Sequence, residues 1–363
     1  MSIAAIICEY NPFHEGHRYQ IEEIRERLGE ETEVLCLMSG NFVQRGEPAV
    51  YDKWSRAGAA VRGGADLVLE LPLTVAVNAA GYFAAGAVQC LDELRGVDYL
   101  CFGSEGMETK SLLSAARTME TPEYENALRK EIRNGVSYAR ARELALADLG
   151  GERACLITPN NALGTDYLRE LLRLESTILP LAVPRNEELP SASELRVGLT
   201  GPGVHRLEYG ERAMLAVFRT LPDEAFKTMP FGSEGLWSKV MRACRRENSM
   251  AEILSACKSK RYTMSRIKRM LLCLYLGLEE ADLNRVIPYL RVLAFNERGR
   301  KMIRKLKNTA RLPLVSGDVP EDTASAAFFS KEARATDLYG LFATPGVPEP
   351  AGREKTASPV YVR

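Results

Sequence analysis

Two of the three histidines in this chain of 363 residues lie three positions apart, as His14 and His17. They flank Gly16 in the segment EYNPFHEGHRYQIEEI, residues 9–24, where an apolar strand pattern gives way to a helical one. Residues three apart share one face of a helix, so both imidazoles can donate hydrogen bonds to one phosphate. Such donors would neutralise the charge that builds up as pyrophosphate leaves. The spacing therefore indicates phosphate chemistry at the start of a helix.

The surrounding residues suit such a site. Pro12 ends the strand pattern, Asn11 is a candidate helix cap, and Gly16 lets a bulky anion approach the first helical turn. Two simpler interpretations of the histidines are a capping histidine beside a surface histidine, and a two-histidine metal site without its carboxylate ligand. A pair around a glycine at a strand-to-helix turn favours the phosphate site.

The elements that must position these histidines follow from the hydrophobic pattern. Short, continuous apolar runs alternate with helical patterns in the first half of the chain, which is typical of parallel strands covered on both faces. We therefore predict an α/β fold, a Rossmann-like domain with a parallel sheet, whose ligands bind at the carboxyl ends of the strands. The predicted strands are SIAAIIC (2–8), EVLCLM (33–38), DLVLEL (66–71), DYLCF (98–102) and TILPLAV (177–183).

Composition bounds the class of protein. With 46% hydrophobic residues and 48 basic against 48 acidic side chains, the chain can bury a large core in two domains, or in one domain with an extension. No apolar run approaches the roughly 20 residues that span a bilayer, and the start MSIAAIICEYN lacks a basic leader, so we expect a cytoplasmic protein with no membrane segment. The eight cysteines form no CxxC or Cys/His pair, which predicts reduced core thiols and no metal site.

Several blocks of the chain carry a family resemblance. PFHEGH (12–17) resembles the HxGH signature of the nucleotidyltransferase superfamily, and PSASELR (190–196) resembles the Ser/Thr-rich turn ending in Arg that accompanies it. Residues 38–72, beginning MSGNFVQRGEP, closely resemble a long signature of the bacterial tRNA(Met) cytidine acetate ligase family. Later blocks of that family are similar to FGSE (102–105), PNNALGTDYLREL (159–171) and RYTMSRIKRMLLCLYLGL (261–278).

The resemblance implies a reaction and a set of residues. ATP and acetate would form acetyladenylate, and the acetyl group would pass to N4 of the wobble cytidine of elongator tRNA(Met). His14, His17 and Arg196 would be catalytic, Mg²⁺ is expected only as the usual companion of a triphosphate, and no organic cofactor is implied. The ATP contacts would map onto Ile7, Cys8, Glu9, Tyr10, Asn11, Pro12, Phe13, His14, Glu15, Gly16, His17, Arg18, Tyr19, Gln20, Gly103, Asn160, Asn161, Arg185, Ser191 and Ser193.

This chemistry needs little from a general base. Acetate is already ionised near neutral pH, so the protein has to align it and stabilise the charge on the pentavalent phosphorus. The cytidine amine is a weak nucleophile whose reaction depends on proximity to the acyl carbon. The residues point to no base for that step, and the cations Arg185 and Arg196 suit the first one.

Some of these residues also have ordinary interpretations. Gly103 suits a turn, and the pair Asn160 and Asn161 suits a helix cap, with no basis for choosing which asparagine would contact ATP. The polar loop SGNFVQRGEP (39–48) suits either a functional loop or a surface connection. Lys53 and Arg56 on the following helix suit either a phosphate or solvent.

One segment departs from the family pattern. After Arg185 the chain reads NEELPSASELR, where the family is expected to carry a glycine-containing stretch with a Tyr-His-Asp triplet. The shortened loop bears on acetate orientation or tRNA entry and leaves the ATP-binding elements intact.

The second half of the chain has a helical texture and a local excess of positive charge. Residues 258–311 contain fifteen Lys or Arg against four acidic residues, which favours an RNA backbone over a merely solvated helix face. Tyr262 and Phe295 are candidates for stacking on unpaired bases. The proposed tRNA contacts are Lys260, Arg261, Arg266, Lys268 and Arg269. We thus expect a catalytic domain (1–210), a mainly helical basic tRNA-binding region (211–342) and a loosely ordered tail (343–363).

Two other functions fit part of the pattern. An adenylyltransferase for a small phosphorylated cofactor precursor would share both motifs but not explain the basic helical half. A tRNA-binding protein with an inactive nucleotide site would fit the altered loop after Arg185, although intact His14, His17 and Arg196 argue against it. The oligomeric state stays open.

Overall fold

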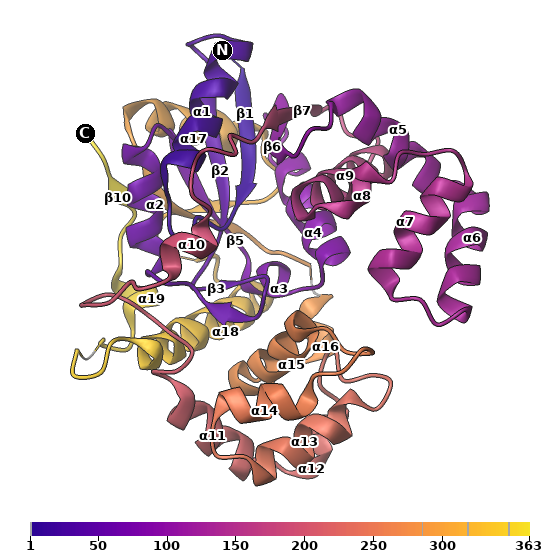
Figure 1. Ribbon diagram of the computed structural model, residues 1–363. Coiled ribbons are helices and arrows are strands. Elements are labelled where there is room, and N and C mark those ends of the chain that lie inside the picture. Colours follow the sequence, from indigo (N-terminus) through magenta and orange to yellow (C-terminus); the bar gives the residue numbers. More distant parts are fainter. Residues whose placement is uncertain (1, 285, 318, 348) are drawn as a thin grey trace.

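The computed structural model describes residues 2–284, 286–317, 319–347 and 349–363 (Figure 1). Five adjacent parallel strands make up most of its main sheet, in the order β5-β2-β1-β6-β7, with β7 at one edge. They coincide with the five predicted apolar runs, as β1 (Ile3–Cys8), β2 (Glu33–Ser39), β5 (Leu67–Leu71), β6 (Tyr99–Ser104) and β7 (Leu179–Pro184). The α/β prediction is confirmed, and the strand order reverses at β1, whose carboxyl end leads into the histidine segment.

Alternate residues of β1 face two helical layers. Ile3, Ala5 and Ile7 belong to a core that includes residues of α4 (Ala80–Asp92), α5 (Thr109–Met119), α9 (Pro159–Arg173) and α17 (Glu297–Thr309). Ala4 and Ile6 pack in a second core with α1 (Glu15–Leu28) and α2 (Lys53–Arg62). Because both faces are covered, the strands are apolar throughout rather than alternating.

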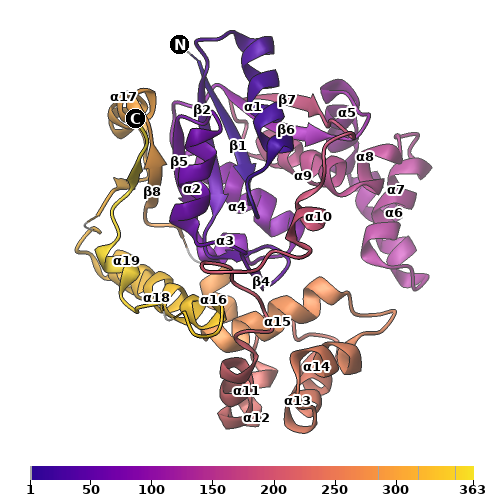
Figure 2. The same ribbon diagram turned by 60° about the vertical axis from the view of Figure 1, so that its left-hand side comes forward.

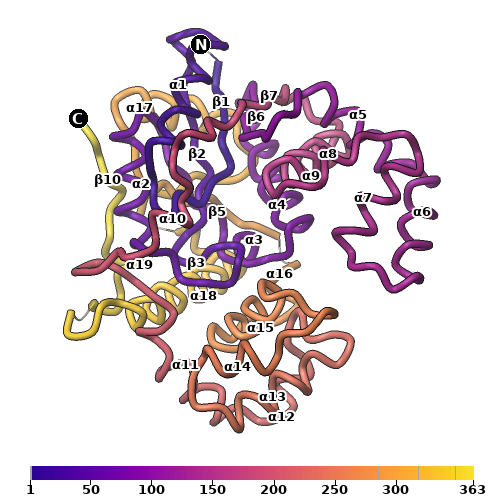
Figure 3. The backbone as a smooth tube through the Cα atoms, in the orientation of Figure 1, coloured from indigo at the N-terminus to yellow at the C-terminus, as the bar shows by residue number. Residues whose placement is uncertain are grey.

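The edge of the sheet beyond β5 comes from the C-terminal part of the chain. Strand β8 (Leu290–Phe295) pairs antiparallel with β5, and both β9 (Leu314–Val315) and β10 (Val360–Tyr361) pair parallel with β8. The region 211–342 is mainly helical, as expected, but it also contains β8 and β9, and the tail 343–363, expected to be loosely ordered, contributes β10 to the sheet. The run LRVLAF is buried in the sheet, and Glu354 of α19 (Arg353–Thr356) is 1% exposed. Figure 3 traces the yellow C-terminal segment back along the sheet.

A helical lobe lies beyond the carboxyl ends of the strands (Figure 2). Its core includes Phe42 of the small hairpin β3 (Phe42–Val43) and β4 (Glu47–Pro48), and Leu73 of α3 (Leu73–Ala76). The predicted helical region is confirmed for α11 (Glu211–Thr220), α12 (Asp223–Lys227), α13 (Leu236–Arg246), α14 (Met250–Cys257), α15 (Met264–Leu276) and α16 (Glu280–Leu283). Because this core includes Phe42 and Leu73, the lobe is packed against the sheet domain rather than separated from it by a linker.

Two further helical parts complete the fold. The helices α6 (Pro122–Arg133) and α7 (Tyr138–Asp148) project from the connection between β6 and α9, and the short helix α8 (Ala154–Ile157) packs against α9 (Figure 1). The long helix α18 (Thr323–Tyr339) packs against α15 and α19. In the described residues, no helix is both long and apolar enough to cross a membrane. All eight cysteines are free thiols, as expected, and seven of them are buried.

Candidate active site

The histidine turn begins α1 with a specific hydrogen-bond pattern. His14 is the N-cap, its Nδ1 accepts from the Gly16 N–H at 3.0 Å, and its own N–H donates to Nδ1 of His17 at 3.3 Å. The two rings lie 3.8 Å apart between centroids. Because Nδ1 of each ring accepts, the neutral tautomer carries its proton on Nε2. Neither Nε2 has a partner in the described part of the chain, so both are available to a phosphate.

Burial keeps these imidazoles neutral. Burial, together with the nearby His14, lowers the pKa of His17 to about 3. Burial also lowers the pKa of His14, and the neighbouring Arg185 lowers it further. Each neutral ring can therefore donate its one N–H to an anion without first gaining a proton, and binding a phosphate would raise both pKa values.

The cap differs from the one expected from the sequence. The Asn11 side chain does not cap α1. It is buried, 6% exposed, beneath the loop that follows β4, and its Oδ1 accepts a hydrogen bond from the backbone N–H of Val50 at 2.7 Å. His14 takes the capping role instead. The capping interpretation is thus correct for Nδ1 of His14, while its Nε2 stays free for other chemistry.

The second motif is joined to the first by Arg196. This residue ends the short helix α10 (Ala192–Arg196), which Ser191 caps through a reciprocal hydrogen-bond pair with Glu194. The Arg196 guanidinium donates to the backbone oxygen of Asn11 at 2.6 Å and to Oγ of Ser193 at 2.9 Å. Residues nearly two hundred positions apart thereby form one site, with a half-buried cation beside the histidine turn.

A polar cluster follows β6 and β7. The carboxylate of Glu105 accepts from Oγ1 of Thr158 at 2.7 Å and from Nδ2 of Asn160 at 2.5 Å, and lies 3.8 Å from the Arg185 guanidinium. Asn161 is 1% exposed and bonds both the N–H and the carbonyl of Glu105, so it holds the loop after β6. Of the two asparagines, Asn160 is therefore the better placed to meet a ligand.

The remaining residues predicted to contact ATP fall into a buried group and a group at the surface. The side chains of Ile7 and Tyr10 lie in the core, and the Tyr10 hydroxyl is 3.3 Å from the sulfur of Cys36. Glu15 and Arg18 form an exposed ion pair at 3.5 Å. A methyl group added at Gly103 would meet open space, so this glycine borders an accessible surface. Cys8, Pro12, Phe13, Tyr19 and Gln20 are partly exposed around the same turn.

The polar loop after β2 is a clamped hairpin. The Gln44 N–H donates to Oε1 of Glu9 at 2.8 Å, which ties the hairpin to the end of β1. On its other side, Lys268 pairs with Glu47, and Arg269 donates to the Gln44 carbonyl at 3.2 Å. At Gly46, with φ of 78°, an added Cβ would come within 2.5 Å of the backbone nitrogen of Arg269, so only glycine fits.

These contacts change the interpretation of the basic segment. Arg269 is 9% exposed, and burial lowers its pKa to about 10, so it serves the hairpin rather than an RNA surface. Arg266 donates to the carbonyls of Phe231 and Ser233. Lys260 and Arg261 are exposed. Arg291, another cation of this segment, lies in a buried cluster, and Arg285 lies outside the described residues.

The two residues predicted to stack on unpaired bases make other contacts within the protein. Tyr262 is 8% exposed, and its hydroxyl donates to the backbone oxygen of Glu234 at 2.6 Å. Phe295 ends β8 and packs on Tyr361, with ring centroids 5.5 Å apart. Neither ring is a free platform for a base in this structure.

Arg56 and Lys53 do not face solvent. Each is 1% exposed. The Arg56 guanidinium donates to the carbonyls of Glu9 at 2.5 Å and Tyr51 at 2.8 Å, and also to those of Ser39 and Gly40. It therefore fixes the ends of β1 and β2. A buried arginine bonded only to backbone oxygens has no pattern in the sequence that would reveal it.

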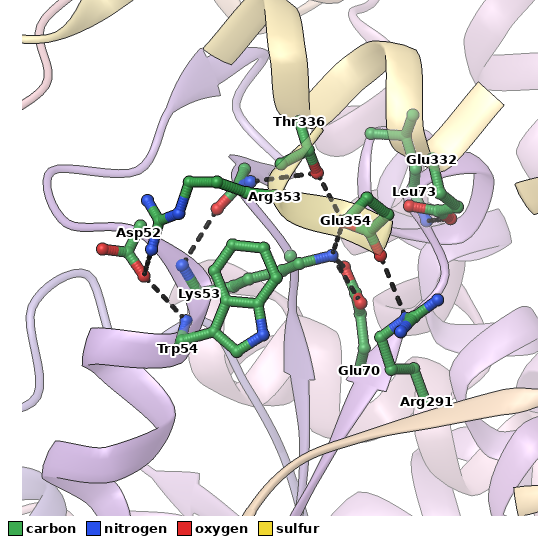
Figure 4. A network of polar contacts seen from close by, with 12 residues as sticks. Asp52, Lys53, Trp54, Glu70, Leu73, Arg291, Glu332, Thr336, Arg353 and Glu354 are labelled. Atoms are coloured by element: carbon green, nitrogen blue, oxygen red, sulfur yellow. Dashed lines mark hydrogen bonds and ion pairs between the residues drawn. The ribbon is translucent and has the colours of Figure 1, made fainter. Parts of the chain in front are cut away.

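Lys53 belongs to a buried cluster that anchors the C-terminal segment (Figure 4). Its Nζ lies 2.7 Å from carboxylate oxygens of both Glu70 and Glu354, and Glu354 also pairs with Arg291 at 3.0 Å. Nearby, Glu332 accepts from the Leu73 N–H at 2.8 Å. Burial, together with Glu70, raises the pKa of Glu332 to about 8, and burial also raises the pKa of Glu70.

The fold and the site define a class of protein. An HxGH turn at the reversal point of a parallel sheet, joined to a Ser-rich turn ending in arginine, is the arrangement of a nucleotide-binding transferase. The family model described as HIGH Nucleotidyl Transferase matches residues 1–201 and 200–353.

Individual relatives narrow the class. The chain is 34% identical to the tRNA(Met) cytidine acetate ligase of Thermoanaerobacter sp. (strain X514), covering 94% of this chain and 95% of the relative. It is 34% identical to that of Acetivibrio thermocellus, with 93% and 94% covered. The crystal structure of Thermotoga maritima TmcAL bound with alpha-thio ATP superposes with a TM-score of 0.90 at 30% identity, over 100% of both chains. The chain belongs to the tRNA(Met) cytidine acetate ligase family.

Proposed function

We propose that this protein uses ATP to activate acetate as acetyladenylate and transfers the acetyl group to N4 of the wobble cytidine of elongator tRNA(Met). The observation that carries the proposal is the hydrogen bond from Arg196 to the Asn11 carbonyl, which unites the two phosphate-binding motifs. Relatives named tRNA(Met) cytidine acetate ligase align with almost the whole chain, and the structurally similar Thermotoga maritima protein was crystallised with an ATP analogue. AMP and pyrophosphate are the other products.

In the adenylation step, the protein supplies donors and alignment. The Nε2–H groups of His14 and His17 and the first N–H groups of α1 would bind phosphate oxygens of ATP. Arg185 and Arg196 would balance the charge that grows on the departing pyrophosphate. His14 and His17 need no change of protonation state for this role, because burial keeps both rings neutral.

The nucleotide would lie across β1 toward β6 and β7. Asn160 and the open surface at Gly103 border that side of the turn, and Glu105 orients both Asn160 and Arg185. We assign Ser191 to capping α10 and Ser193 to orienting Arg196. Among the described residues, no cluster of three or more His, Cys, Asp or Glu suits a metal, so Mg²⁺ would be held mainly by the triphosphate oxygens.

In the transfer step, the RNA has to bring a weak nucleophile to the acyl carbon. The helical lobe lies at the carboxyl edge of the sheet, next to the hairpin that touches Glu9, and its exposed Lys260 and Arg261 suit an RNA backbone. We assign residues 1–210 to catalysis and the lobe to tRNA binding, with the segment after 290 completing the sheet. A cytoplasmic location fits a tRNA-modifying enzyme.

The two half-reactions can be tested separately. Without RNA, labelled pyrophosphate should exchange into ATP only when acetate is present. With unmodified elongator tRNA(Met), label from acetate should enter the RNA, and AMP should form in equal amount. Exchange that needs a phosphorylated small molecule instead of acetate would favour an adenylyltransferase, and tight tRNA binding without ATP turnover would favour an inactive nucleotide site.

A further inference from the structure

The hairpin β3–β4 presents one arginine, Arg45, at its tip. Arg45 is exposed and makes no hydrogen bond or ion pair within the described ranges. The residues on either side of it are held: Gln44 by Glu9, Glu47 by Lys268, and Gly46 by its close approach to Arg269. The backbone under Arg45 is therefore fixed at three points while its guanidinium is left unpaired.

The surroundings of Arg45 carry excess positive charge. Arg45 and Arg196 both lie close enough to the Glu9 carboxylate to lower its pKa, against a larger rise caused by burial. Arg56 donates to the Glu9 carbonyl from the buried side. Glu47 is the acidic residue of the hairpin itself, and it is paired with Lys268. Three guanidinium groups thus surround one carboxylate, which favours binding of a second anion.

Arg45 lies on the β2 side of the histidine turn, across β1 from the proposed contacts Asn160 and Arg185. Strands β2 and β6 flank β1, so the hairpin after β2 and the Glu105 loop after β6 lie on either side of the turn. Of the groups assigned to ATP beyond the turn, Asn160 and Arg185 belong to the β6–β7 side, whereas Arg196 bonds to the turn at Asn11 and lies near Arg45. A free cation on the β2 side is available for the other anionic substrate of the reaction.

We infer that Arg45 binds the carboxylate of acetate and aims it at the α-phosphorus of ATP, an inference that rests on the proposed function. One acetate oxygen forms the new bond to phosphorus, the bond from that phosphorus to the bridging oxygen breaks, and the electron pair leaves with pyrophosphate. A guanidinium fork suits a carboxylate because it offers two parallel donors and fixes the orientation of both oxygens. The clamped hairpin supplies the rigidity that such alignment requires.

The test uses acetate-dependent exchange of pyrophosphate into ATP, without RNA, on the full chain. For Arg45→Ala we expect the KM for acetate to rise by about tenfold or more, with the KM for ATP within about twofold of the unaltered protein. Arg45→Lys keeps the charge but loses the planar fork, so its KM for acetate should lie between those of the unaltered protein and Arg45→Ala. Arg62→Ala removes an exposed arginine from the last turn of α2 and serves as the matched control with unchanged constants.

The remaining outcomes overturn the inference. An equal rise in the KM for ATP would assign Arg45 to the triphosphate, and normal exchange combined with failed tRNA acetylation would assign it to RNA. Unchanged constants in Arg45→Ala and Arg45→Lys would remove it from the substrate site. If the unaltered protein showed no acetate-dependent exchange at all, the proposed function itself would fail together with the inference.

Discussion

The guanidinium of Arg196 lies 2.6 Å from the backbone oxygen of Asn11, the residue that opens the turn to His14 and His17. This bond makes two distant segments one site. It also fixes where the positive charge of Arg196 can act, because the same guanidinium holds Ser193 on its other side. The first two predictions follow from this arrangement.

Replacing Arg196 by Ala should lower kcat/KM for ATP by about 10²-fold or more, because a cation that stabilises the departing pyrophosphate would be lost. Arg196→Lys should recover only part of the loss, since lysine lacks the planar fork whose two nitrogens bond to Asn11 and Ser193. Steady-state exchange kinetics would measure both. Ser193→Ala is the control, because it removes only the hydrogen bond between Ser193 and Arg196. A fall in kcat/KM as large as that of Arg196→Ala would contradict a direct role of the arginine.

Replacing His17 by Ala should reduce kcat for acetate adenylation by about 10²-fold, with the fold retained. His14→Ala removes the cap of α1 as well, so it should also lower the thermal midpoint. Comparing kcat with the melting temperature separates the two effects. Equal losses of stability with normal kcat would show that the histidines serve only the helix.

The basic residues of the α15 region should separate into two groups. Lys260→Ala with Arg261→Ala should weaken tRNA binding and reduce the salt slope of log K by about two, without changing adenylation. Arg269→Ala should instead impair adenylation, because it releases the Gln44 carbonyl and the hairpin. Filter binding at several salt concentrations, beside RNA-free exchange, checks both. A flattened salt slope for Arg269→Ala with normal adenylation would reverse the assignment.

The buried cluster of Figure 4 should stabilise the C-terminal segment. Glu354→Gln leaves Lys53 and Arg291 short of one negative charge, and removing one member of a buried ion pair typically costs about 3–5 kcal/mol. Urea unfolding measures the loss. The control Glu125→Gln breaks the exposed pair with Arg129 and should cost at most about 1 kcal/mol. Similar losses for both variants would contradict the anchoring role.

Glu332 should make stability fall as pH rises. Its pKa in the folded protein is raised to about 8 from 4.5, so above about pH 4.5 the unfolded chain releases a proton that the folded protein keeps. The stability contribution is complete below pH 4.5 and is lost progressively up to pH 8. Glu332→Gln mimics the protonated acid and should gain stability relative to the unaltered protein between pH 5 and pH 8. Stabilities of the two proteins that change in parallel between pH 5 and pH 8 would contradict the raised pKa of Glu332.

How much of this could be predicted from the sequence depended on the range of the contacts. The central strands were predicted because each is a continuous apolar run between helical patterns, and His14, His17 and Arg196 were found through local motifs. Strand β8 was missed because LRVLAF lies inside a basic, helical segment and pairs with β5 far upstream. Asn11 does not cap α1 because it bonds to Val50, and Arg269 is buried where it bonds to Gln44, partners that no local pattern reveals.

Charge counting misled for a related reason. The excess of cations in residues 258–311 suggested one surface, yet the chain places Arg269 under a hairpin, Arg291 in the cluster beside Glu354, and Arg304 on the exposed side of α17. Composition records charge along the chain, whereas an RNA surface needs charge gathered in space. The polar loop after β2 is a second example: its position depends on three separate contacts that only the fold brings together.

The most direct test of the account is to incubate the protein with ATP, labelled acetate and unmodified elongator tRNA(Met), then digest the RNA and measure N4-acetylcytidine by mass spectrometry. We expect label at the wobble cytidine, dependent on ATP, and none when His14 and His17 are both replaced by Ala. Unlabelled RNA in the presence of active ATP turnover, or equal labelling by the double variant, would contradict the central claim.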